Sequence, residues 1–154
     1  MATLGRLRGM KLAAGLSLFW AVAAQAADRT PEQVVKDHVA AMKSADVDAV
    51  MRDYAADTVV ITPPGLVPTQ QPTTGPGVYS GVANARKVFV VLTGKDSIAG
   101  IRAMETTVEP LGGDTALLHW VQFRGTAQQV SGTDVFVVRG GKVVVQDIIV
   151  DAAH

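Results

Sequence analysis

The second half of the chain is a series of strand-like segments separated by short glycine turns. These segments are rich in β-branched residues, and we expect four strands, at residues 98–110, 115–124, 133–139 and 142–150. The turn between the last two is Gly140-Gly141, a two-residue hairpin signal. Because strands joined by such short turns pair antiparallel, this half must form an antiparallel sheet.

Helical signals lie before this sheet. Residues 30–44 begin with a capping box, in which a Thr N-cap and a Pro at the first helical position precede a Gln at the third. Asp46 can cap a second, shorter helix, one face of which would carry Val47, Val50, Met51 and Tyr54. A short strand is expected at residues 58–62. A third helix is expected between an N-cap at Ser80 and Gly94.

Helices followed by consecutive antiparallel strands predict an α+β domain with its helices on one face of the sheet. The last two strands are apolar at both odd and even positions, so both faces of the sheet must be covered. The helices cover one face, and we expect a homodimer to cover the other. If Asp134 faces inward, that outer face carries Val135, Val137, Val143, Val145 and Ile149.

The first 26 residues have the three-part pattern of a secretory signal peptide. A basic region precedes the 13-residue apolar run 12–24, and Ala24-Gln25-Ala26 supplies the cleavage pattern. The run is shorter than the roughly 20 residues that span a bilayer, which favours cleavage over a retained membrane anchor. We therefore expect a signal peptide at 1–26 and one exported domain at 27–154, periplasmic or secreted and free of the membrane.

Composition excludes several function classes. Without the leader, 11 basic and 14 acidic residues remain, so nothing favours binding to nucleic acid. The absence of cysteine excludes disulfides, thiolate metal sites and a cysteine nucleophile. The three histidines, His38, His119 and His154, have no metal-ligand spacing, and nucleotide-binding glycine motifs and a nucleophile-elbow serine are absent. We therefore expect no metal and no cofactor.

Five of the seven prolines fall within residues 63–77. A long loop of this kind inside a compact domain is usually a lid over a site or a disordered excursion. Prolines stiffen the chain, which favours the lid. Since the loop follows the first strand at Thr62, it would lie at the mouth of any pocket.

Polar residues on apolar elements are the candidate site residues. His38 lies on the apolar face of the first helix, as either a core histidine or a pocket residue. Asp134 shares a strand face with Phe136 and Val138, where a carboxyl is costly unless it is protonated or paired. Burial there would raise its pKa, whereas a solvated strand edge would leave the pKa ordinary.

Three further polar or amphipathic residues sit on the expected strands. Gln146 falls among apolar residues on the face that carries Val144 and Ile148. Trp120 either packs in the core or stacks on a ligand. Gln122 lies on the same expected strand, and alternation alone does not say which face either residue takes.

The order of elements resembles the NTF2-like superfamily, which includes ketosteroid isomerases and SnoaL-like polyketide cyclases. The resemblance is carried by residues 45–65, by the third helix around Ser80–Phe89, and by the closing hairpin 132–151; it covers essentially all of residues 31–151. It implies a curved sheet wrapped around three N-terminal helices, forming a cone with an apolar pocket for a small hydrophobic molecule. Homodimers through the outer sheet face are common in that superfamily.

The resemblance also suggests roles for individual residues. The general-base aspartate of the isomerases corresponds to Thr62, which cannot abstract a proton. Their oxyanion-hole tyrosine corresponds to His38. Their second oxyanion donor, a protonated aspartate, corresponds to Asp134, on the strand where SnoaL-like cyclases carry an acid/base group.

Asp134 and His38 are therefore the candidate catalytic pair, one donating and the other accepting a proton. The substrate would be a small apolar carbonyl compound undergoing isomerisation, cyclisation, dehydration or hydration without a cofactor. The alternative is a non-catalytic exported domain for ligand binding or assembly, including an immunity or envelope partner. An open cavity that both residues line would favour the enzyme. A cone filled by side chains would favour the non-catalytic domain. The expected pocket residues are Tyr54, Thr62, Phe89, Trp120, Gln122, Phe136 and Gln146.

Overall fold

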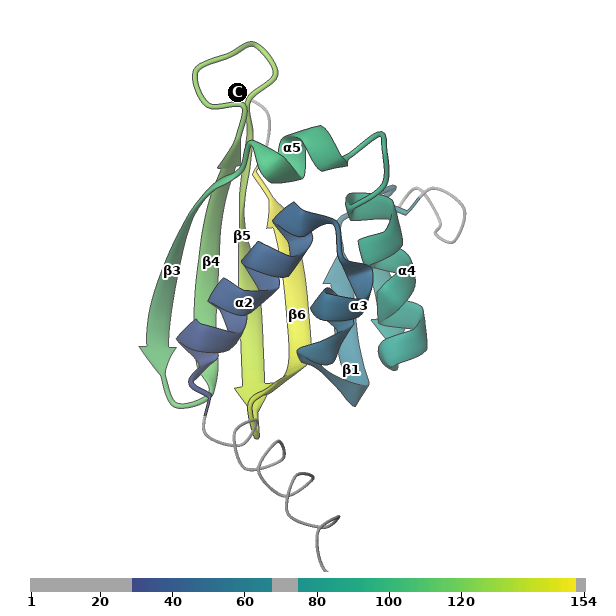
Figure 1. Cartoon of the computed structure of the whole chain (residues 1–154), viewed down its shortest axis with the longest axis vertical. Helices are drawn as coiled ribbons and strands as arrows, with labels where there is room; N and C mark the ends of the chain where they lie inside the picture. Colours follow the sequence, from purple (N-terminus) through teal and green to yellow (C-terminus); the bar gives the residue numbers. More distant parts are fainter. Residues whose placement is uncertain (1–28, 68–74, 152–154) are drawn as a thin grey trace, which may run out of the picture.

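The computed structural model describes residues 29–67 and 75–151. The expected helices and strands occur in the expected order, together with one short strand and one short helix that were not expected, and all the described helices end before residue 105 (Figure 1). The elements are α2 (Pro31–Ser44), α3 (Val47–Arg52), β1 (Tyr54–Thr62), β2 (Gly77–Ser80), α4 (Val82–Leu92), α5 (Ile98–Arg102), β3 (Glu105–Gly112), β4 (Thr115–Gln122), β5 (Val130–Arg139) and β6 (Lys142–Val150).

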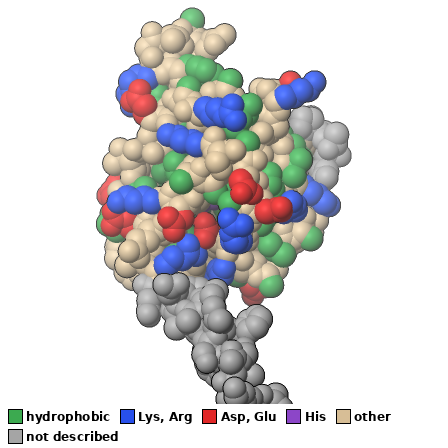
Figure 2. Space-filling model, viewed as in Figure 1, with side chains coloured by type: hydrophobic (Ala, Val, Ile, Leu, Met, Phe, Trp, Pro, Cys, Tyr) green, Lys and Arg blue, Asp and Glu red, His purple; other side chains and the backbone are tan. Residues whose placement is uncertain are grey.

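The strands form one six-stranded sheet in the order β2-β1-β6-β5-β4-β3. Every neighbouring pair is antiparallel except β1 and β6, which run parallel. The sheet curves around α2, which crosses its concave face, while α3 and α4 lie over β1 (Figure 1). Lys, Arg, Asp and Glu side chains intermingle on the surface of this helical layer (Figure 2). The α+β cone is thus confirmed.

The predicted caps of the first two helices are confirmed. Thr30 Oγ1 accepts from the Gln33 backbone N–H, and the Gln33 side chain accepts from the Thr30 N–H, which completes the capping box. Asp46 accepts from the Ala49 N–H at the start of α3. One face of α2 is buried, and His38 belongs to it, at 3% exposure.

The second helix is shorter than expected and the first strand longer. Helix α3 ends at Arg52, and Tyr54 begins β1 instead of continuing the helical face. Parallel pairing with β6 is the physical reason, because the Val143 N–H donates to the Asp53 carbonyl and Tyr54 lies opposite Val143. The register of β1 against β6 shifts between Tyr54 and Val59, so the two strands remain paired on both sides of this irregularity.

Two other boundaries in the sequence prediction were wrong. Residues Ile98–Arg102 form helix α5, so the expected strand 98–110 begins only at Glu105. Gly77–Ser80 forms the edge strand β2, and α4 is preceded by Gly81 rather than capped by Ser80. Gly81 has φ of 81°, a left-handed conformation that glycine adopts without strain.

A β-bulge corrects the expected orientation of Val143. The register of β5 and β6 shifts between Val137 and Val138, so Val138 pairs with Val143, which is fully buried. The outward set on these two strands is therefore Val135, Val137, Val145 and Ile149, of which Ile149 is the most exposed at 45%. These residues form the outer face on which the homodimer prediction rests.

Two expectations fall largely outside the described residues. The signal peptide 1–26 lies in the part not described, and of the loop 63–77 residues 68–74 are not described. The described start of that loop packs inward, with Val67 buried and Leu66 at the cavity discussed below. Among the described residues, none of the helices has the length and apolar character needed to cross a bilayer.

Candidate active site

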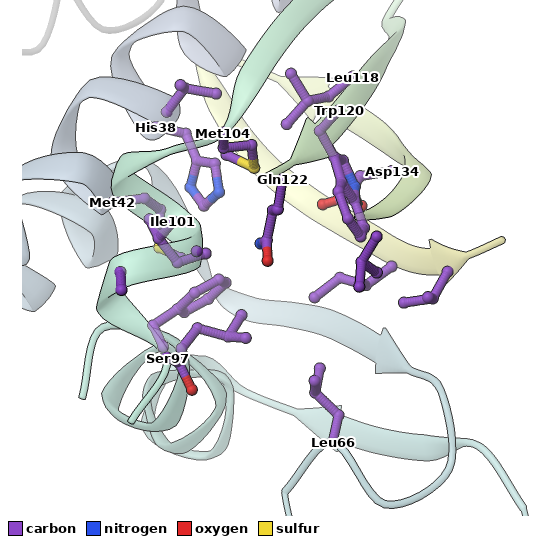
Figure 3. Close-up of a pocket in the computed structure, with 18 of the residues that line it drawn as sticks. His38, Met42, Leu66, Ser97, Ile101, Met104, Leu118, Trp120, Gln122 and Asp134 are labelled. Atoms are coloured by element: carbon purple, nitrogen blue, oxygen red, sulfur yellow. Dashed lines mark hydrogen bonds between the residues drawn. The ribbon is translucent and has the colours of Figure 1, made fainter. Parts of the chain in front are cut away.

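A cavity of about 360 Å³ lies between the concave face of the sheet and helices α2, α4 and α5. Most of its lining is apolar, and helix α5 closes one side of it (Figure 3). The apolar lining includes Val39, Met42, Leu66, Phe89, Ile101, Met104, Leu118 and Ile148. The polar and amphipathic lining residues of the cone interior are His38, Trp120, Gln122, Asp134 and Gln146.

Six of the nine sequence-predicted site residues line this cavity: His38, Phe89, Trp120, Gln122, Asp134 and Gln146. Tyr54, Thr62 and Phe136 are buried but do not line it, which corrects the expected pocket. Tyr54 and Phe136 pack against the ring of His38, with ring centroids 5.7 and 5.3 Å away. They support the cavity wall from behind.

The contribution of α5 was missed, because residues 98–110 were expected to be one strand. Ser97 directly before Ile98 is a residue type that caps helices, and this signal could have revealed the break. Gly100 lets α5 approach β4, since a Cβ at this position would collide with the side chain of Gln122. The helix thereby brings Ser97, Gly100 and Ile101 to the cavity.

His38 reaches the cavity from the buried face of α2. Its ring packs edge-on against Phe89 and Phe136 and lies 3.2 Å, at Nδ1, from the Tyr54 hydroxyl. Burial without a nearby carboxylate lowers the pKa of His38 to about 3, so the imidazole is neutral near pH 7. Among the described residues, Nε2 has no hydrogen-bond partner, and the side chain points into the cavity (Figure 3).

Asp134 lies on β5 and accepts two hydrogen bonds at the cavity wall. Trp120 Nε1 donates to Oδ1 and Gln146 Nε2 to Oδ2, both at 2.8 Å. Gly132 makes room for the indole, because a Cβ there would overlap the Trp120 ring. Burial raises the pKa of Asp134 to about 7, against the lowering effect of the two donors. Both protonation states of Asp134 are therefore populated near neutral pH.

Tyr54 and Gln146 connect the two candidate catalytic residues. The Tyr54 hydroxyl donates to Gln146 Oε1, while its oxygen contacts His38 Nδ1. Burial raises the pKa of Tyr54 well above its usual value, so it remains a phenol. A continuous chain of hydrogen-bonding groups thus runs from Asp134 through Gln146 and Tyr54 to His38.

This arrangement can move a proton inside an apolar cavity. A carboxyl that titrates near neutral pH can both take and return a proton, and a neutral imidazole can hydrogen-bond to a ligand oxygen. Within residues 29–67 and 75–151, no cluster of three or more His, Asp or Glu side chains could hold a metal ion. Asp134 and His38 are the ionisable groups on the inner wall of the cavity with the hydrogen-bonding capacity for acid/base chemistry.

Comparisons with known proteins agree with this fold. Residues 35–146 match the SnoaL-like domain family, while no curated protein matches the chain. An NTF-2 like protein of unknown function from Burkholderia xenovorans LB400 is similar, with 16% identity, a TM-score of 0.60, and coverage of 80% of this chain and 84% of that one. TerC, co-crystallized with polyporic acid, is also similar, with 16% identity, a TM-score of 0.57, and coverage of 79% and 92%.

A de novo designed protein with a curved β-sheet shares the architecture as well, with 14% identity, a TM-score of 0.58, and coverage of 79% of this chain and 84% of that one. Similarity at this level of identity shows the fold alone, and the same fold hosts unrelated activities. The family match extends over most of the chain, from α2 into β6. The chain belongs to the SnoaL-like family of NTF2-like domains.

Proposed function

We propose that this domain binds a small hydrophobic carbonyl compound in its cavity and catalyses cofactor-independent proton transfer on it. Asp134 acts as the proton acceptor and donor, and His38 hydrogen-bonds to the ligand oxygen when that oxygen becomes negative. The observation that carries the proposal is that both residues line one open cavity instead of a filled cone.

The cavity favours a small, flat ligand. Its volume of about 360 Å³ is near the lower end of the ~300–1,000 Å³ typical of ligand pockets. Trp120 and Phe89 offer ring surfaces, and the remaining lining is mostly aliphatic or thioether. A ligand of one or two rings fits these dimensions.

The proposed reaction begins when Asp134 removes a proton from the carbon next to the carbonyl. The C–H electron pair becomes the enolate. In a ketone with a β,γ double bond this is a dienolate, and Asp134 returns the proton to the γ carbon, which gives the conjugated isomer. The same enolate can add to a second carbonyl in a cyclisation or expel a β-hydroxyl in a dehydration. Thr62 does not line the cavity, so the proton acceptor is Asp134 and not a residue at that position.

We further propose that the protein is exported and acts as a homodimer in the periplasm or outside the cell. The leader pattern of residues 1–26 supports export. The apolar outer face formed by Val135, Val137, Val145 and Ile149 supports the dimer.

The alternative function is non-catalytic ligand binding. It is favoured by the hydrogen bonds from Trp120 and Gln146, which engage both oxygens of Asp134 and give this carboxyl a structural task. The same pocket would then hold a ligand without turning it over.

One experiment separates the two functions. Trp120 is the sole tryptophan after residue 26, so its fluorescence reports on the cavity of the mature protein. We would titrate 2-tetralone, a bicyclic ketone with an acidic C–H, and follow its hydrogen–deuterium exchange by NMR at neutral pH. Quenching together with exchange that Asp134→Asn abolishes supports the enzyme. Quenching without exchange supports the binding domain. If neither quenching nor exchange is observed, a site for small ketones is refuted.

A further inference from the structure

The chain of hydrogen bonds behind the cavity fixes which nitrogen of His38 carries the proton. A tyrosine hydroxyl has one hydrogen, and that of Tyr54 is donated to Gln146 Oε1. The 3.2 Å contact between the Tyr54 oxygen and His38 Nδ1 is then a hydrogen bond only if Nδ1 carries a hydrogen. In this arrangement Nε2 presents a lone pair to the cavity.

The orientation of the Gln146 amide depends in turn on Asp134. Gln146 Nε2 donates to Asp134 Oδ2, and the Trp120 indole N–H, which can only donate, occupies Oδ1. The observed arrangement therefore fits an ionised Asp134. Because the Trp120 N–H keeps Oδ1 an acceptor, we place the proton that Asp134 takes up on Oδ2, where an O–H directed at Gln146 faces its N–H.

Rotation of the Gln146 amide by half a turn relieves this conflict. Oε1 then accepts from the Asp134 O–H, and Nε2 donates to the Tyr54 oxygen. The Tyr54 hydroxyl is released from Gln146 and donates to His38 Nδ1. For this to happen the imidazole releases its Nδ1 proton and takes one up at Nε2 by exchange with water, so the charge of the ring does not change. Each of the three contacts that link Asp134, Gln146, Tyr54 and His38 again pairs a donor with an acceptor, as a buried network requires, and His38 Nε2 faces the cavity.

We propose that Gln146 and Tyr54 are positioning residues that make the tautomer of His38 follow the protonation state of Asp134. With Asp134 ionised, His38 offers the cavity a hydrogen-bond acceptor. With Asp134 protonated, it offers a donor.

Only Asp134 changes its charge in this cluster near neutral pH. The groups that face it are Trp120 on β4, Gln146 on β6, and Tyr54 and His38 beyond them on β1 and α2. Asp147, the next residue after Gln146, adds a negative charge that helps to raise the Asp134 pKa. His38 stays neutral because burial lowers its pKa to about 3.

For the reaction, this coupling rests on the proposed function. Before proton transfer, the lone pair of His38 Nε2 gives no hydrogen bond to a ketone oxygen. Once Asp134 has taken the proton from carbon, exchange with water in the cavity replaces the Nδ1 proton of His38 by one on Nε2, and Nε2–H then donates to the oxygen that has become negative. A hydrogen bond that exists only after proton transfer stabilises the enolate and not the bound ketone, which is what lowers a barrier. The substrate class is accordingly a small ketone with an enolisable C–H.

The test uses the ligand-free protein, so it is independent of whether any ketone is turned over. In a full-length chain with His119→Gln and His154→Gln, His38 is the sole histidine. Nitrogen-15 NMR of the labelled ring distinguishes hydrogen on Nδ1, on Nε2 and on both. We expect the hydrogen on Nδ1 above neutral pH, on Nε2 below it, and a midpoint equal to the Asp134 carboxyl titration followed by carbon-13 NMR.

Four variants examine the link. Asp134→Asn, whose amide N–H can donate to Gln146 as a protonated carboxyl would, should hold the hydrogen on Nε2 at every pH. Tyr54→Phe and Gln146→Met should each abolish the pH-linked switch. Gln122→Met is the matched control, because it removes a cavity-lining amide that bonds none of the four groups, and it should preserve the switch.

Three results would overturn the proposal: a His38 ring that keeps one tautomer while Asp134 titrates, a doubly protonated ring at the midpoint, or a switch that survives in both Tyr54→Phe and Gln146→Met. Circular dichroism shows whether these two variants fold. If one of them does not, the result from the other decides whether the switch depends on the connecting residues. Failure of the ketone exchange assay with an intact switch would refute the proposed function alone.

Discussion

The burial of Asp134 and His38 predicts opposite pH dependences of stability that cancel in the wild type. Burial raises the Asp134 pKa from 3.8 to about 7, so between these values the native state holds a proton that the unfolded state has released. Its contribution to stability is present below pH 3.8 and is lost as pH rises through about 7. The difference in pKa corresponds to about 4 kcal/mol.

His38 acts in the other direction. Its pKa falls from 6.5 to about 3 on folding, so below pH 6.5 the unfolded state binds a proton that the native state excludes. Its contribution is present above pH 6.5 and is lost as pH falls towards about 3. Between about pH 4.5 and 6, each group changes the free energy of unfolding by about 1.4 kcal/mol per pH unit, with opposite signs.

If either group is removed, the free energy of unfolding should change with pH as the remaining group alone dictates. In Asp134→Asn the free energy of unfolding should rise by about 1.4 kcal/mol per pH unit over this range, and in His38→Gln it should fall by about as much. The assay is urea unfolding of residues 27–154, in which Trp120 is the sole tryptophan and its fluorescence reports unfolding. Asp57→Asn, which removes an exposed carboxyl, is the control and should retain the wild-type profile. Parallel curves for the wild type and Asp134→Asn would refute the burial of an ionisable Asp134.

Three other predictions follow from separate contacts. Arg29→Ala should destabilise the fold by about 1–3 kcal/mol in urea unfolding, since it leaves the buried Asp53 carboxyl without its 2.7 Å partner; an unchanged midpoint would show that water replaces the guanidinium. Gly100→Ala should weaken ketone binding more than stability, because its methyl displaces the Gln122 side chain, and equal losses would contradict this. Light scattering should give a dimer mass, and a monomer for Ile149→Lys; a monomeric wild type would refute the interface.

Much of the fold could be predicted because its signals are local. The capping box at residues 30–33 is written in consecutive residues, and so is the glycine hairpin at 140–141. The boundary at Tyr54 has no such local signal, and the one at Ile98 has only the helix-capping residue type of Ser97. Tyr54 pairs with Val143, almost ninety residues later, and α5 depends on Gly100 fitting against Gln122. Tertiary contacts of this kind override local preference.

In the candidate site, too, some residues could be predicted from local patterns and others depend on tertiary contacts. Strand alternation for Asp134, helical spacing for His38 and the family resemblance predicted both residues at the cavity, because an apolar face that carries one polar residue is visible in the sequence. Tyr54 was assigned to the cavity, and its actual position behind His38 depends on the parallel pairing of β1 with β6.

The β5–β6 bulge bears on the same question. It turns Val143 inward while Gln146 keeps the inward orientation that simple alternation assigned to it. Gln146 can therefore reach Asp134 diagonally across the pair, with Phe136 directly opposite it. Replacing Gln146 by an apolar residue would leave the Tyr54 hydroxyl and one Asp134 oxygen without these partners inside the protein. The hydrogen bonds of Gln146 to Asp134 and Tyr54 thus explain why a glutamine occurs in an otherwise apolar strand. These bonds join residues of three strands and, through Tyr54, His38 on a helix, so no single stretch of the sequence contains them.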